Sequence, residues 1–123
     1  MISYEVYKII HLFGLFGMFL SLGGLVLYVM GGGTKADFKL RKWVAISHGV
    51  FLFLVLLGGF GMAARLQWHN AWPIRFYVKL AMWLVFGGML AIPYRFPALA
   101  KPLWFILPIL GAFVAYVVIA KPF

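Results

Sequence analysis

The 123-residue sequence contains no cysteine. Disulfide bonds, thiolate metal sites, iron–sulfur clusters and covalent attachment of c-type haem are therefore excluded. Any metal or cofactor must be held noncovalently, through nitrogen or oxygen ligands.

Charged residues are scarce as well, at 11%, and only two of them, Glu5 and Asp37, are acidic. With 66% hydrophobic residues, the chain has too little polar surface to cover a soluble domain of its size, so we interpret it as a single-domain integral membrane protein, residues 1–123. A net charge of +9 would suggest nucleic acid as the partner of a soluble protein. Here the Lys and Arg residues lie between apolar segments, where membrane lipids and topology explain them, and no nucleic-acid partner is expected.

Four apolar runs, at about residues 7–30, 44–64, 76–94 and 103–120, approach the length that crosses roughly 30 Å of hydrocarbon. The first run is too long for a secretory signal and lacks a cleavage-site pattern, so we interpret it as a retained helix. The runs predict an all-α fold of four transmembrane helices in an antiparallel up-and-down bundle. Basic residues at 31–43 and 95–101 outweigh those at 65–75, which predicts a bacterial cytoplasmic (inner) membrane protein with both termini outside.

None of the four runs contains Asp, Glu, Asn or Gln. A proton-coupled exporter needs a carboxylate within the membrane, and the nearest one, Glu5, lies at the edge of the first run where it can pair with Lys8. An ion path would also lack lining groups. A small channel or exporter is therefore disfavoured.

Nitrogen-bearing side chains gather toward one membrane face. His11 lies about a turn inside the outer end of the first run, Lys79 about a turn inside the same end of the third, and His69 in the loop on that side. His48 lies near the opposite end of the second run, roughly 20 Å deeper than His11 at 1.5 Å per residue, so the two should not share one haem. We expect His11, with Lys79 or His69 opposite, to ligate haem or a related tetrapyrrole, and His48 to belong to a second, cytoplasmic site.

Each of these residues also has a structural interpretation. Lys79 can snorkel to the interface, and His69 can be an ordinary solvated histidine. His11 and His48 can each form a hydrogen bond to a neighbouring helix. The first run also places small residues on the face that carries His11, where a flat ligand or another helix could approach the backbone: Gly14, Gly17, Ser21 and Gly24. The pairs Gly23-Gly24, Gly58-Gly59 and Gly87-Gly88 predict close helix packing.

Three motifs, in order and spacing, carry a family resemblance: Lys8-Ile9-Ile10-His11 opening the first run, Arg41-Lys42-Trp43 followed by Ser47-His48 at the second, and Trp72 with Lys79-Leu80 at the third. The chain resembles the SirB-like and copper-resistance-D-like small membrane proteins, and more distantly the HemJ-type membrane protoporphyrinogen oxidases. The resemblance implies a four-helix bundle with His11 and Lys79 as the haem-linked pair. Gly24-Leu25-Val26-Leu27-Tyr28 lacks the Pro-Arg that follows the corresponding run in the oxidases, so the resemblance implies an architecture rather than that reaction.

Two hypotheses of function follow, and they leave open whether the protein is an enzyme. In the first, a small membrane protein binds haem near the outer face and takes part in electron transfer or haem handling. In the second, the chain is a noncatalytic accessory subunit of a larger membrane complex, with its glycine-rich faces for helix packing and its basic loop for a partner. A homo-oligomeric channel or exporter is the weakest alternative.

Overall fold

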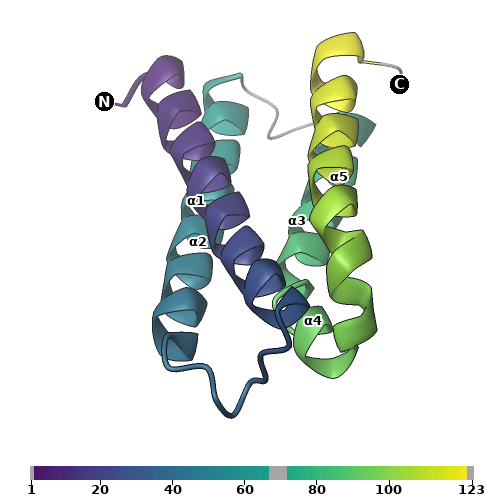
Figure 1. Cartoon of the computed structure of the whole chain (residues 1–123). Coiled ribbons are helices and arrows are strands. Elements are labelled where there is room, and N and C mark those ends of the chain that lie inside the picture. The colour runs from purple at the N-terminus through teal and green to yellow at the C-terminus, as the bar shows by residue number, and fades with distance from the viewer. Residues whose placement is uncertain (1, 67–71, 122–123) are drawn as a thin grey trace.

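The computed structural model describes residues 2–66 and 72–121, and these residues form helices and no strands. Along the chain the helices are α1 (Tyr4–Met30), α2 (Arg41–Arg65), α3 (Ile74–Gly88), the short α4 (Ile92–Arg95), the 3₁₀ helix η1 (Pro97–Leu99) and α5 (Ala100–Ala120). The all-α prediction is confirmed. Figure 1 shows both chain ends at one end of the molecule and the loop between α1 and α2 at the other.

Three helical segments are long and apolar enough to cross a membrane: α1, α2, and the continuous segment Pro97–Ala120. They correspond to the first, second and fourth predicted runs. Their outer faces carry large apolar side chains that the fold leaves uncovered, including Leu20 at 77% exposure and Ile119 at 80%. Such extensive exposure is unfavourable in water and suits a lipid environment.

The third predicted run differs from the structure. α3 has 15 residues, a length of about 22 Å at 1.5 Å per residue, and a turn at 89–91 separates it from α4. Pro93 explains the break, because its ring would clash with the carbonyl of Met89 in a continuous helix and it has no amide hydrogen to donate. The predicted end at residue 94 is therefore wrong, and α3 ends at Gly88.

Glycines bring α1 and α2 into close contact. A Cβ atom added at Gly14 would lie 2.8 Å from both the Phe51 carbonyl oxygen and the Val55 amide nitrogen, and one at Gly58 would lie 2.6 Å from the Cβ of His11. Helix α2 thus occupies the small-residue face of α1 around Gly14. Gly24 does not belong to this interface, because an added Cβ there meets nothing within 4 Å.

The buried core lies toward the α1–α2 loop, where the second half of α1 packs against the end of α3 and the start of α5. Its members are Met18, Leu22, Leu25, Val26, Val29, Phe86, Ala100, Leu103 and Leu107. Contacts between α2 and α3 are sparse by comparison with those between α1 and α2. In Figure 1, α1 crosses the molecule from the side of α2 toward α4 and α5. The core therefore lies away from the end that carries the chain termini, and the candidate site lies at that end.

Candidate functional site

His11 of α1 is tied to the main chain of α2. Its Nδ1 atom lies 2.8 Å from the carbonyl oxygen of Val55, and the side chain is half-buried. Because a carbonyl oxygen can only accept a hydrogen bond, Nδ1 carries the proton. In the neutral imidazole the lone pair is then on Nε2, which is the arrangement that metal-ligating histidines use.

The position of His11 depends on the glycine pair of α2. Gly58 lies against the backbone and Cβ of His11, and a Cβ atom added at Gly59 would be 3.7 Å from the His11 ring. A side chain at Gly58 would separate α1 from α2 and break the hydrogen bond to Val55, whereas a Cβ atom at Gly59 would make an ordinary van der Waals contact with the ring. The predicted packing role of this glycine pair is therefore seen directly beneath the histidine.

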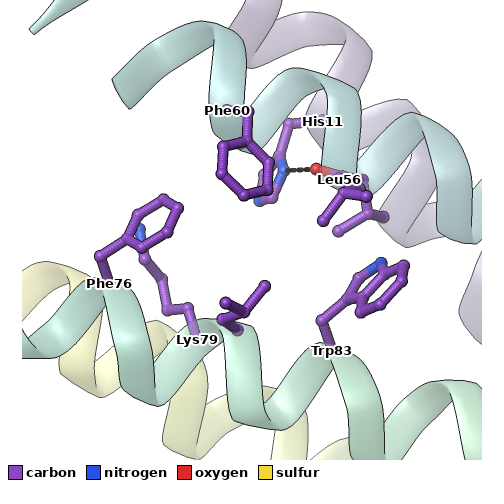
Figure 2. Close-up of a pocket in the computed structure, with 9 residues that line it drawn as sticks. His11, Leu56, Phe60, Phe76, Lys79 and Trp83 are labelled. Carbon is purple, nitrogen blue, oxygen red and sulfur yellow. Dashed lines mark hydrogen bonds between the residues drawn. The ribbon is translucent and has the colours of Figure 1, made fainter. Parts of the chain in front are cut away.

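Lys79 reaches the same cavity from the opposite wall. The cavity has a volume of about 50 Å³ and lies between α1 and α2 on one side and α3 on the other. Figure 2 shows His11, Leu56 and Phe60 on one wall and Phe76, Lys79 and Trp83 along α3 facing them. The Lys79 Nζ atom lies 6.0 Å from the centre of the Phe76 ring. His11 and Lys79 thus line the same cavity, with aromatic rings between them.

Trp83 closes the cavity toward the core. Its indole Nε1 donates a hydrogen bond of 2.9 Å to the carbonyl oxygen of Leu52 on α2. Phe76, Lys79 and Trp83 follow one another at helical spacing along α3. That spacing was visible in the sequence, but nothing distinguished Phe76 and Trp83 from the many other aromatic residues until the helices were placed.

A second cavity of about 130 Å³ adjoins the first and shares Gly59 and Lys79 with it. It lies toward the chain termini, and Arg75 and Lys121 contribute positive charge to its lining. None of the described residues that line either cavity is acidic. Going outward from His11, the lining of the two cavities therefore changes from aromatic to cationic side chains. Such a lining suits a ligand with a flat apolar body and an anionic edge.

The donor set fits haem iron, but the space does not hold a macrocycle as the helices stand. Binding pockets for ligands of drug size have volumes of about 300–1,000 Å³, far above the 50 Å³ and 130 Å³ found here. Haem would fit only if α2 and α3 moved apart, and their contacts are sparse. Within residues 2–66 and 72–121, no cluster of three His, Cys, Asp or Glu residues could hold a metal ion by itself.

His48 lies apart from this site. It is 3% exposed, and its Nε2 donates a 3.0 Å hydrogen bond to the carbonyl oxygen of Phe86, which joins α2 to α3. It does not line the His11 cavity. This hydrogen bond is the structural interpretation that the sequence allowed for His48, and its assignment to a second ligand site stays a prediction. His69, the other predicted ligand, lies outside the described residues.

Comparison with known proteins gave no match to a family model, a curated protein or a solved structure.

Proposed function

We propose that the protein is a four-span membrane protein of the bacterial inner membrane that binds haem or a related tetrapyrrole through His11, near the outer face, in electron transfer or haem handling. The observation that carries the proposal is the hydrogen bond from His11 Nδ1 to the Val55 carbonyl, which leaves Nε2 as a ligand facing Lys79 across an aromatic cavity. The resemblance of the motifs around His11 and Lys79 to haem-containing membrane proteins agrees with it.

The proposed topology places four helices across the membrane, with α3 as the shortest. Residues 35–42 carry Lys35, Lys39, Arg41 and Lys42 against Asp37 alone. The positive-inside rule puts this segment in the cytoplasm and both termini outside. The His11 cavity then lies near the outer surface, because it is at the same end of the molecule as the termini.

In this proposal the side chains have distinct roles. His11 would bind iron through Nε2, and its hydrogen bond at Nδ1 would fix the ring and raise its basicity. Lys79 would supply a second nitrogen on the opposite wall once it loses its proton. Arg75 and Lys121 would pair with carboxylates at the edge of the bound group. When bound, the group would supply one-electron redox chemistry, and Phe60, Phe76 and Trp83 would exclude water from the site.

An absorption titration of the purified full chain with hemin tests the proposal. Wild type should give a Soret band with saturable stoichiometric binding, and His11→Asn should lose it. Asn is the matched substitution, because its amide nitrogen can keep the hydrogen bond to the Val55 carbonyl but offers nothing at the position of Nε2. His48→Gln serves as the control and should bind hemin like wild type. Equal titrations of wild type and His11→Asn would contradict the proposal.

The small cavity volume favours a second candidate function, that of a noncatalytic accessory subunit. On this alternative His11, His48 and Trp83 serve only as ties between helices, since each bonds a main-chain carbonyl of a neighbouring helix. It predicts co-purification with other membrane proteins after mild solubilisation, and full retention of that association in His11→Asn.

A further inference from the structure

A larger cavity lies at the opposite end of the molecule from His11. It has a volume of about 450 Å³ and lies where α2 begins and where α3 gives way to α4. This volume falls within the range of about 300–1,000 Å³ that small-molecule pockets occupy. Its lining consists of Lys35, Arg41, Lys42, Val44, Ala45, Gly87, Gly88, Leu90, Ala91 and Tyr94.

The charged side chains that line this cavity are all cationic. Lys35, Arg41 and Lys42 are cationic, and none of the described residues that line the cavity is acidic. The nearest acid along the chain, Asp37, accepts a hydrogen bond of 3.1 Å from the hydroxyl of Thr34 and does not belong to the lining. Arg41 and Lys42 also stand in the first turn of α2, where the helix dipole is itself positive. An anion in the cavity would offset this accumulation of charge.

Side-chain contacts hold the loop that brings these cations together. Tyr28 stacks on Phe38 with ring centres 3.9 Å apart and donates a 2.8 Å hydrogen bond to the carbonyl of Thr34. Arg41 Nη1 donates a 3.2 Å bond to the carbonyl of Lys35, and the Lys35 Nζ atom lies 5.5 Å from the centre of the Tyr94 ring. These contacts order the loop that carries Lys35 and bring it beside Arg41 and Tyr94.

The rest of the lining is apolar. Val44, Ala45, Leu90 and Ala91 continue the cavity toward the hydrophobic part of the helices. A ligand that fits such a surface has an anionic head and an apolar tail. A free inorganic anion would satisfy only the cationic wall.

We propose that this cavity binds the phosphate headgroup of an anionic phospholipid, with Lys35, Arg41 and Lys42 around the headgroup and the acyl chains leaving past Val44 and Leu90. The proposal requires that the chain is a membrane protein, but it is independent of any cofactor at His11. It assigns the basic loop a specific ligand in addition to its role in topology.

Native mass spectrometry of the full chain, delipidated in mild detergent, provides the test. The protein is titrated with phosphatidylglycerol and with phosphatidylcholine of the same acyl chains. Phosphatidylglycerol should bind at least about fivefold more tightly, because a single Lys or Arg near an anionic headgroup contributes a factor of about that size. Equal binding of the two lipids would overturn the proposal.

Substitutions locate the binding. Lys35→Gln and Lys42→Gln should each weaken phosphatidylglycerol binding about fivefold. Lys39→Gln removes the same charge from the same loop, but it should leave binding unchanged because Lys39 does not line the cavity. Arg41 is kept, since it also holds the loop through the Lys35 carbonyl. An equal loss in Lys39→Gln would show a diffuse charge effect and overturn the proposal.

A filled cavity gives an independent readout that leaves the charges in place. A Cβ atom at Gly88 meets nothing within 4 Å, so Gly88→Leu should occupy the cavity and reduce lipid binding, while Gly49→Leu, equally open but outside the lining, should not. Inorganic phosphate is titrated alongside. If phosphate alone binds and phosphatidylglycerol does not displace it, the ligand is a free anion and the lipid proposal is wrong.

Discussion

The imidazole of His11 and the main-chain carbonyl of Val55 meet across the α1–α2 interface, with Nδ1 and the oxygen 2.8 Å apart. One contact thus joins two consecutive helices and sets which ring nitrogen holds the proton. The same contact serves both proposed functions, as a helix tie in one and as the orienting bond of an iron ligand in the other. Stability and cofactor binding can be separated by substitution.

His11→Ala should destabilise the cofactor-free protein, whereas His11→Asn should not. Loss of the hydrogen bond to Val55 should lower the free energy of unfolding by about 0.5–1.5 kcal/mol, and Asn can retain this bond through its amide. Thermal unfolding in detergent without hemin measures the difference. If the Ala and Asn variants unfold at the same temperature, the bond to Val55 contributes nothing to stability.

Gly58→Ala should destabilise the α1–α2 pair more strongly than either His11 substitution. The added Cβ would lie 2.6 Å from the main-chain nitrogen of His11 and 2.7 Å from the carbonyl oxygen of Tyr7. Backbone atoms cannot move aside as a flexible side chain can, so the helices must separate. This should lower the free energy of unfolding by about 1–3 kcal/mol.

Gly49→Ala is the matched control for Gly58→Ala on the same helix, since a Cβ there meets nothing within 4 Å. It should leave the stability unchanged or raise it by up to about 1 kcal/mol, through better helix propensity. Chemical denaturation of the two variants measures both effects. Equal effects of the two substitutions would mean that close packing at Gly58 does not hold α1 against α2.

His48→Ala should weaken the contact between α2 and α3, and His48→Gln should preserve it. The side chain is 3% exposed and bonds the Phe86 carbonyl through Nε2, a position that the amide nitrogen of Gln can reach. Removing a buried donor and leaving its acceptor unpaired lowers stability by about 1–3 kcal/mol. Thermal unfolding of both variants provides the measurement, and a Gln variant as unstable as the Ala variant would contradict the role given to this bond.

Much of the helical layout could be predicted from apolar runs alone. The first, second and fourth runs correspond to α1, α2 and α5 within about three residues at each end. The third run continues past the end of its helix. Residues 89–94 are apolar enough to extend the run, but α3 ends at Gly88 and Pro93 prevents the helix from continuing. Composition finds apolar segments, but local backbone geometry decides where a helix stops.

The site was predictable only in part, for a similar reason. Depth along antiparallel helices brought His11 and Lys79 to one level, and in the structure they line one cavity. The carbonyl partners of His11 and His48 depend on helix rotation and tilt, which spacing does not determine. The same holds for the volume of the cavity and for the cationic wall around Lys35, which depends on the packing of Tyr28 on Phe38.

Cysteine labelling can test whether α3 crosses the membrane, because the sequence contains no cysteine of its own. If α3 crosses the membrane, cysteines introduced at Leu66 and Ala98, on either side of it, should react with an impermeant thiol reagent from opposite faces. Leu66→Cys should be labelled in intact cells together with Ile2→Cys, and Ala98→Cys only after permeabilisation, as Lys39→Cys should be. All four positions are exposed.

At 15 residues α3 is short for a hydrocarbon thickness of about 30 Å, so crossing requires local thinning of the bilayer or support from the arginine and tyrosine residues near its first turn. Labelling of Leu66→Cys and Ala98→Cys from the same face would instead leave a three-span protein with α3 lying within one leaflet.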